Sequence, residues 1–200
     1  MAPIESQLDQ QPVFDYTVAN VTEKPELTKT ITAISSQYKK PLLKFSGSCA
    51  GCAETSYARL ITQLFGERMY ISNATGCSSI WGGPAATSPY TTNFKGQGPA
   101  WANSLFEDNA EHGFGMYLGQ KAIRNRLVDE VKAICEKTGD EALKAACAAY
   151  LETLNDGAKN GAATEALVAA LEKTECGCEE KKDILANKEY LSKKSVWIFG

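Results

Sequence analysis

The sequence predicts an α/β fold built from short parallel strands joined by helices. Residues 41–47 and 69–74 are apolar runs of strand length, and each is followed directly by a turn. Between them, apolar residues recur at helical spacing from Tyr57 to Phe65, and Gly66 is a natural helix end. This order of strand, turn, helix, strand and turn is typical of sheets that bind ligands where their strands end.

The composition is that of an ordinary globular protein. Of the 200 residues, 44% are hydrophobic and 22% are charged, which is enough for one domain with a sizeable core. The net charge of -3 provides no general attraction to nucleic acid or anionic lipid. No stretch approaches the roughly 20 apolar residues of a membrane span, and the first residues lack a signal-peptide pattern. We therefore expect a cytoplasmic protein that binds neither nucleic acid nor membrane.

The chain divides into four segments of different character. Residues 1–40 carry prolines and no sustained period, so we expect an extended arm or linker. Residues 41–116 contain the predicted core and its ligand-binding turns. Residues 117–185 are rich in alanine and helical stripes, which indicates a helical insertion, and residues 186–200 return to a core strand. Because a buried parallel strand normally leads into a functional turn, we expect the sequence to continue past Gly200.

Two patterns refine this division. Residues 81–116 are rich in glycine, proline, asparagine and aromatic residues, which predicts a long ordered loop that lines a site. Apolar stripes in the insertion predict helices around 123–134, 143–154 and 162–173.

Seven cysteines and a single histidine limit the available chemistry. An odd number of cysteines without an export signal favours free thiols and metal ligands over disulfides. Cys135 and Cys147 fall on the apolar stripes, so we interpret them as buried structural thiols. The histidine, His112, is interpreted as a packing or surface residue.

Three further cysteines form the candidate site. Cys49 and Cys52 make a Cys-x-x-Cys pair, which places two sulfurs on one turn of backbone where a single metal centre can bind both. Cys77 lies in the Gly-Cys-Ser-Ser turn at 76–79. The glycine of this turn lets backbone approach an anion, and the serines can donate hydrogen bonds at a helix N-terminus. Metal–thiolate chemistry and phosphate binding are thus predicted to meet at one point.

Longer motifs around these cysteines resemble one known family. They are FSGSCAGCAET at 45–55, NATGCSSI at 73–80 and GPAWANSLFEDNAE at 98–111. All three closely resemble the thiamine-diphosphate domain of pyruvate:ferredoxin (flavodoxin) oxidoreductases, and the likeness runs through essentially the whole chain.

The resemblance implies a partial thiamine-diphosphate-binding fold and assigns cofactors to the site. Cys49, Cys52 and Cys77 match three of the four thiolates that hold the [4Fe–4S] cluster nearest the thiamine. Glu54 matches a contact of thiamine diphosphate, and the turn after the second strand is a further contact. The residues of that turn are Gly76, Cys77, Ser78 and Ser79. The Mg²⁺ ligands and the fourth cluster cysteine are expected outside this chain.

The resemblance also implies an activity and its partners. The family oxidatively decarboxylates pyruvate with coenzyme A to acetyl-CoA and CO₂, and it passes electrons through the cluster to ferredoxin or flavodoxin. The implied partners are the remaining domains of the same enzyme, in a homodimer. Because those domains supply substrate-binding groups, we expect this chain alone to be inactive. Ala53 stands where the family usually has glycine, and we expect a small effect.

Other interpretations of these residues remain open at this point. Cys49 and Cys52 could join Cys176 and Cys178 in a four-thiolate zinc site of a non-catalytic structural module. A Cys-x-x-Cys pair is also the motif of thioredoxin-like redox proteins. Glu54, at the start of a predicted helix, would be favourable there through the helix dipole alone.

Overall fold

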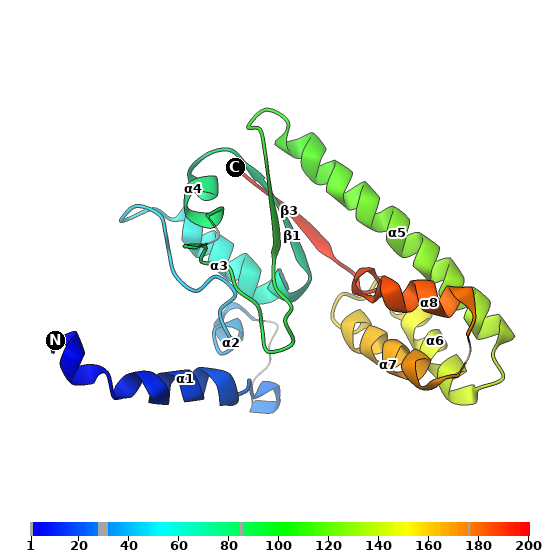
Figure 1. Ribbon diagram of the computed structural model, residues 1–200. Helices are drawn as coiled ribbons and strands as arrows, with labels where there is room; N and C mark the ends of the chain where they lie inside the picture. The colour runs from blue at the N-terminus through cyan, green and yellow to red at the C-terminus, as the bar shows by residue number, and fades with distance from the viewer. Residues whose placement is uncertain (1, 28–31, 85, 176) are drawn as a thin grey trace.

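The computed structural model confirms the α/β fold class. It describes residues 2–27, 32–84, 86–175 and 177–200. A parallel sheet of three strands lies at its centre in the order β2-β1-β3 (Figure 1). The strands are β1 (Met69–Ala74), β2 (Ala100–Ser104) and β3 (Ser195–Phe199). The strands β1 and β3 were predicted from their apolar runs, and the central strand is the one that leads to Cys77.

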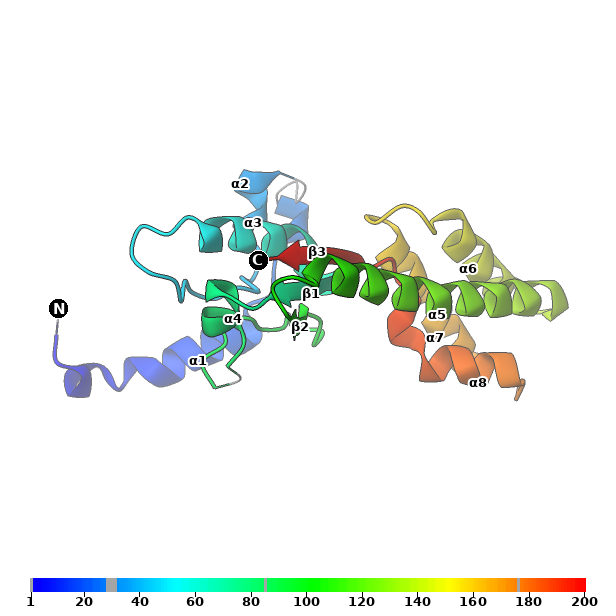
Figure 2. The same cartoon turned by 90° about the horizontal axis from the view of Figure 1, so that it is seen from above.

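Helices cover both faces of the sheet. Neighbouring residues of a strand point to opposite faces, and β3 shows this directly. Its Ile198 faces Gly113 of helix α5 (Asn109–Lys137), where a Cβ at position 113 would lie only 2.7 Å from the Ile198 Cγ1. Its Trp197 instead packs on Phe65 of helix α3 (Glu54–Phe65), with ring centroids 5.1 Å apart. The helices α5 and α3 therefore sandwich the sheet (Figure 2).

The predicted helix at 57–65 is confirmed as α3, which is followed by the short helix η3 (Gly66–Arg68). Its buried face differs from the predicted stripe, because Tyr57 is 68% exposed and Ala58 is buried. The face that carries Ala58 and Thr62 is the one that packs inward.

The predicted strand at 41–47 is wrong. Leu42 and Leu43 are buried as expected, but their only strand-like pairing in the described residues is a single antiparallel bridge from Leu43 to Tyr90. Pro89 precedes Tyr90; its carbonyl accepts from the Lys44 N–H, but because proline has no N–H, it cannot return a bond to Lys44 and complete the next rung.

The prediction of one long loop over 81–116 is also wrong in part. Strand β2 lies within it, and α5 begins at Asn109 rather than near 117. The helix α4 (Cys77–Gly82) extends into the start of this region. Strand β2 escaped prediction because its sequence, AWANS, is short of large apolar residues, whereas β3, which is also an edge strand, reads SVWIF.

The second half of α5 builds a separate helical unit with three further helices (Figure 1). These are α6 (Glu141–Glu152), α7 (Asn160–Lys173) and α8 (Glu179–Ala186). The predicted helices around 123–134, 143–154 and 162–173 are confirmed as α5, α6 and α7. The helix α8 was missed because it is mostly charged and buries only Ile184. A short helix, η4 (Lys188–Tyr190), returns the chain to β3.

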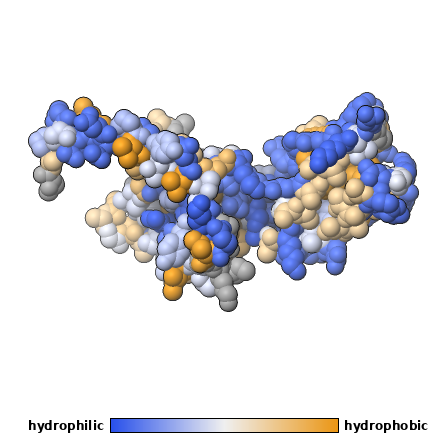
Figure 3. Space-filling model, turned by 90° about the horizontal axis from the view of Figure 1, so that it is seen from below, coloured by the Kyte–Doolittle hydropathy of each residue, from blue (hydrophilic) through white to orange (hydrophobic). Residues whose placement is uncertain are grey.

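The N-terminal residues project from the core as an arm (Figures 1 and 2). Its elements are η1 (Ile4–Gln7), α1 (Gln10–Asn20) and η2 (Pro25–Leu27), and α2 (Ala33–Ser36) follows next to α3. None of the residues of α1 is buried. Apolar side chains such as Phe14, which is 64% exposed, therefore lie on the surface of the arm (Figure 3). No helix in the described ranges has the length and apolarity needed to span a bilayer.

Candidate functional site

The parallel register brings the carboxyl ends of all three strands to one edge of the sheet. Ala74 pairs with Ser104, and Asn73 pairs with Phe199. The turn that carries Cys77 leaves the central strand at this edge, which is where open α/β sheets bind ligands. The order of strand, turn and helix in the sequence likewise predicts the candidate site at the ends of the strands.

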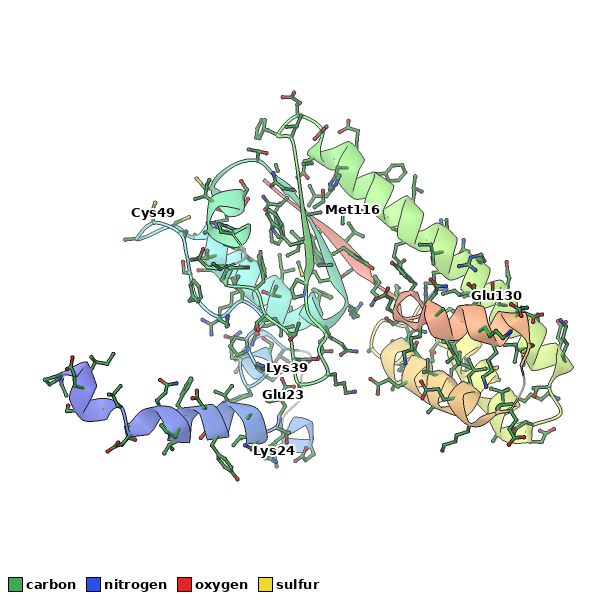
Figure 4. All side chains as sticks on the ribbon, viewed as in Figure 1. Glu23, Lys24, Lys39, Cys49, Met116 and Glu130 are labelled. Atoms are coloured by element: carbon green, nitrogen blue, oxygen red, sulfur yellow. The ribbon has the colours of Figure 1, made fainter. Side chains whose placement is uncertain are left out.

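Cys49 and Cys52 lie on a single tight turn. The backbone N–H of Cys52 donates to the carbonyl of Cys49 at 3.1 Å, which closes a β-turn. Gly51 occupies the third position with φ +81°, a conformation that a type II turn requires and that side chains rarely adopt. The expectation that the Cys-x-x-Cys pair shares one turn is met by this geometry. Both thiols are exposed, and Cys49 stands at the tip of its loop (Figure 4).

Three hydroxyl groups fasten this loop to α3. Oγ of Ser46 lies 2.8 Å from Oγ1 of Thr55 and 3.0 Å from Oγ of Ser48. Thr55 is buried in the first turn of the helix. The loop is therefore anchored on its N-terminal side, while the cysteines project beyond the anchor.

Glu54 is the first residue of α3 and is half-buried. It lies close enough to Tyr90 to act on its ionisation. Burial and then the charge of Glu54 raise the pKa of Tyr90. The buried hydroxyl of Tyr90 has no hydrogen-bond partner among the described residues. Glu54 is thus near a buried hydroxyl that has no hydrogen-bond partner among the described residues.

Cys77 begins the short helix α4, and its two serine neighbours have different roles. Oγ of Ser79 accepts from the Gly76 N–H at 2.9 Å and donates to the Gly76 carbonyl, so it caps the helix. Ser78 is 2% exposed, and no described residue hydrogen-bonds its Oγ. A Cβ added at Gly76 would meet nothing within 4 Å, so the backbone there is open. A hydroxyl without a hydrogen-bond partner, next to accessible backbone, fits a ligand that carries hydrogen-bond acceptors, such as a diphosphate.

The two cysteine-bearing segments meet through a glycine. A Cβ at Gly47 would stand 2.8 Å from the Cβ of Trp81, in α4. The loop that leads to Cys49 therefore packs directly on the helix that Cys77 begins.

The described residues nevertheless do not assemble a complete metal site. In the described part of the chain, no three His, Cys, Asp or Glu side chains are grouped closely enough to hold a metal ion. Cys49 and Cys52 share one turn, whereas Cys77 lies on the adjoining segment and is exposed. The donor set itself fits an iron–sulfur cluster, because thiolates are its usual ligands.

The zinc alternative receives no geometric support. Cys49 lies at one end of the molecule, and α8, which Cys178 immediately precedes, lies at the other (Figures 1 and 4). The fourth member of that set, Cys176, lies outside the described residues.

Sequence reasoning missed Asn109, which connects all three strands at the candidate edge. Its Oδ1 accepts from Oγ of Ser72 in β1 at 2.7 Å and from Oγ of Ser104 in β2 at 3.0 Å. Its Nδ2 donates to the carbonyl of Phe199 in β3 at 2.8 Å. Asn109 is 6% exposed. A polar residue directly after an acidic pair at a helix start was a signal for a cap, but its long-range partners were not visible in the sequence.

A large cavity lies elsewhere. It has a volume of about 880 Å³, and Glu67, Arg68 and Lys193 contribute to its walls. Its charges are mixed, and none of the candidate site residues lines it.

No protein-family model matches the chain. Individual proteins, however, are similar to it in sequence. The chain is 46% identical over 200 residues to the pyruvate-flavodoxin oxidoreductase of Klebsiella pneumoniae. The matched region covers 100% of this chain and 17% of that protein. It is 48% identical to the pyruvate:ferredoxin oxidoreductase of Moorella thermoacetica, over 84% of this chain and 15% of that protein. It is 46% identical to the mitochondrial pyruvate dehydrogenase (NADP+) of Euglena gracilis, over 90% of this chain and 10% of that protein. The chain thus spans less than a fifth of these curated relatives, and it belongs to the pyruvate:ferredoxin (flavodoxin) oxidoreductase family.

Proposed function

We propose that this chain is the part of a pyruvate oxidoreductase that binds thiamine diphosphate and one [4Fe–4S] cluster. The observation that carries the proposal is the turn after β1. There Cys77 stands between the open backbone of Gly76 and the buried, unpartnered hydroxyl of Ser78. Cys77 would be a cluster ligand, and its two neighbours suit a diphosphate. This arrangement supports the proposal that the cluster and thiamine diphosphate bind next to each other. The names of the relatives support pyruvate as the substrate.

The three thiols would act as cluster ligands. Cys49 and Cys52 come from one β-turn, and Cys77 comes from the segment that packs against the same loop through Gly47 and Trp81. Thiolate ligands and backbone N–H groups set the potential of such a cluster. The fourth ligand would come from a cysteine outside this chain.

Other residues would hold and orient thiamine diphosphate. Ser78 would donate to a diphosphate oxygen, and Gly76 would leave room for it. Glu54 would contact the cofactor from the start of α3. When bound, thiamine diphosphate supplies carbanion-stabilising chemistry and the cluster supplies one-electron transfer.

The reaction proposed for the intact enzyme is oxidative decarboxylation of pyruvate with coenzyme A to acetyl-CoA and CO₂. Ferredoxin or flavodoxin would accept the electrons. The remaining domains of the enzyme, Mg²⁺ and a second subunit would complete the active site. The intact enzyme would act in the cytoplasm. This chain alone is therefore expected to be inactive.

Anaerobic reconstitution with ferrous iron and sulfide tests the cluster assignment. The chain is expected to gain iron, sulfide and the visible absorption of an iron–sulfur cluster. Cys49→Ser, Cys52→Ser and Cys77→Ser should each lose most of this absorption, because each removes a ligand. Cys178→Ser is the matched control and should load normally.

Two results would contradict the assignment. One is normal cluster loading of the Cys77→Ser variant. The other is one equivalent of zinc per chain without visible absorption, combined with loss of zinc in the Cys178→Ser variant, which would favour the zinc site.

A further inference from the structure

Two basic residues occupy neighbouring positions at the amino ends of the strands, in the wall of the large cavity. Arg68 directly precedes β1, and Lys194 directly precedes β3. Because Met69 pairs with Ser195 in the parallel register, Arg68 and Lys194 lie on adjacent strands, whose backbones run about 4.8 Å apart. Like charges at such positions are unfavourable unless an anion neutralises them.

The guanidinium of Arg68 is held in place but has no acceptor. A Cβ at Gly157 would lie 2.9 Å from its Nη1 and 3.2 Å from its Nη2. Its Cζ lies 5.4 Å from the centre of the Phe65 ring. Arg68 is half-buried, yet its side chain forms no hydrogen bond or ion pair with any described residue. Because such donors normally have partners away from water, this guanidinium points to a ligand that accepts hydrogen bonds.

Lys194 is a second cation without a partner. It is half-buried, and its side chain likewise forms no ion pair or hydrogen bond with the part of the chain that the structure describes. Burial lowers the pKa of Lys194, and the charge of Glu189 opposes this effect only in part. A bound anion would stabilise the protonated lysine.

Four carboxylates also line the cavity, and three of them already have a lysine or backbone N–H partner. These three are Glu23, Glu67 and Glu165. The fourth, Glu189, is exposed and forms no ion pair with a described residue. The mixed charges of the cavity therefore leave positive charge beside Arg68 and Lys194.

Two glycines give the cavity room for a ligand. Gly157 lies against Arg68, and Gly161, in the first turn of α7, lines the same cavity. A Cβ at Gly161 would meet nothing within 4 Å, so the backbone there faces open space. The volume of about 880 Å³ lies within the range of small-molecule sites, about 300–1,000 Å³.

We propose that this cavity binds a phosphate group through Arg68 and Lys194. The forked guanidinium would donate a pair of parallel hydrogen bonds to phosphate oxygens, a geometry that arginine provides and lysine does not. Lys194 would add a second positive charge. The volume of the cavity favours a phosphate ester of a small organic molecule over the free ion.

The proposed phosphate site is separate from the candidate cofactor site. Arg68 and Lys194 lie where β1 and β3 begin, whereas the turn with Cys77 follows the end of β1. Strand β3 runs away from the helical unit towards the C-terminus (Figure 1). The two sites are therefore at opposite edges of the sheet, and the phosphate site does not depend on the proposed function.

Titration of the purified chain with phosphate, followed by ¹⁵N–¹H correlation spectra, tests this proposal. Chloride at the same ionic strength is the reference, because it screens charges equally without offering a phosphate group. We expect inorganic phosphate to shift the amide signals of Gly157, Gly161 and Lys194 until they saturate. Glycerol 3-phosphate is the second probe. Saturation at a lower concentration than with inorganic phosphate would identify an ester as the ligand, and saturation at the same concentration would identify the free ion.

Variants assign the binding to the two cations. Arg68→Gln should weaken phosphate binding by about tenfold or more, because it removes a charge-assisted, bidentate contact. Lys194→Gln should weaken it as well. The matched control is Arg59→Gln, since Arg59 is exposed on α3 and does not line the cavity. It removes the same charge and should leave the affinity unchanged.

Ser78→Ala distinguishes this site from the proposed diphosphate contact. It should abolish phosphate binding at the turn after β1 and leave the shifts of Gly157 and Gly161 intact. The proposal is overturned if phosphate shifts no signal of the cavity beyond the chloride reference, or if Arg68→Gln binds as tightly as Arg59→Gln. The location of the shifts in the wild-type spectra decides the question if Arg68→Gln fails to fold. A failed cluster reconstitution would leave this result unchanged.

Discussion

Gly47 lies so close to Trp81 that a Cβ at position 47 would stand 2.8 Å from the Trp81 Cβ. Real Cβ atoms essentially never approach so closely, and the Trp81 Cα lies only 3.6 Å from the same point. The contact thus combines a side chain and backbone of α4 with the loop that leads to Cys49. The geometry holds the two cysteine-bearing segments together at a point where only glycine fits.

Replacement of Gly47 by alanine should force these segments apart. We expect destabilisation by about 1–3 kcal/mol, the usual cost of overpacking, together with a reduced yield of reconstituted cluster. The unfolding midpoint in urea and the iron content measure the two effects. Gly119→Ala is the control, because a Cβ there meets nothing within 4 Å on helix α5. It should be neutral or slightly stabilising, and an equal effect of both variants would contradict the role of the contact.

Asn109 provides a second test of how the site edge is held. Asn109→Ala removes the acceptor of the Ser72 and Ser104 hydroxyls and the donor to the Phe199 carbonyl. Each buried polar group left without a partner costs about 1–3 kcal/mol, so this variant should be among the most destabilised in the sheet.

The control for this variant lies on the same helix. Asn125 is exposed on α5, and Asn125→Ala should change the free energy of unfolding by less than about 0.5 kcal/mol. Urea titrations of the two variants give the comparison. A loss for Asn109→Ala as small as that for Asn125→Ala would show that water replaces the three hydrogen bonds without cost.

The sequence predicted some parts of this structure and not others. Local sequence patterns were sufficient to predict those elements whose structure depends mainly on residues close together in the sequence. The helix predicted at 57–65 follows from its period, the central strand follows from its apolar run, and the shared turn of Cys49 and Cys52 follows from the Cys-x-x-Cys spacing.

Contacts between distant residues were not predictable in the same way. Asn109 binds groups 37 and 90 residues away, and no local period marks such partners. Gly47 was visible in the sequence only as a turn residue, and packing against α4 shows why it must be glycine. Strand β2 depends on pairing with β1 rather than on its own apolar content.

His112 should carry its proton on Nδ1. The Asn109 Nδ2 donates to the Phe199 carbonyl, so its Oδ1 must be the atom that accepts from Ser72. The single hydroxyl proton of Ser72 is then used, and the His112 Nδ1 lying 2.7 Å away must be a donor. As His112 is the only histidine, two-bond ¹⁵N–¹H correlation spectra can report this tautomer without assignment ambiguity. A neutral ring protonated on Nε2 would contradict this network.

Glu54→Ala separates a cofactor role from a helix-dipole role. In the intact enzyme we expect weaker binding of thiamine diphosphate, measured by titration calorimetry, with little change in the cluster spectrum. A role through the dipole of α3 alone would instead cost about 0.3–1 kcal/mol of stability and leave the affinity unchanged. Glu67, which is exposed in η3, provides the control, and Glu67→Ala should leave both the affinity and the spectrum unchanged.

Cys147 should make the stability of the chain sensitive to alkaline pH. Its folded-state pKa of about 11 lies above the ordinary value of 9.0, because burial disfavours the thiolate. The folded state therefore retains the proton longer than the unfolded state, and its contribution to stability is fully present below pH 9. This contribution should decline as pH rises from about 9 to about 11. Urea unfolding across this range measures the slope, and Cys147→Ala should flatten it. The slope is the readout because the cavity left by alanine lowers stability at every pH. An unchanged slope in Cys147→Ala would assign the alkaline loss to other groups, such as the half-buried Tyr90, whose pKa is also raised.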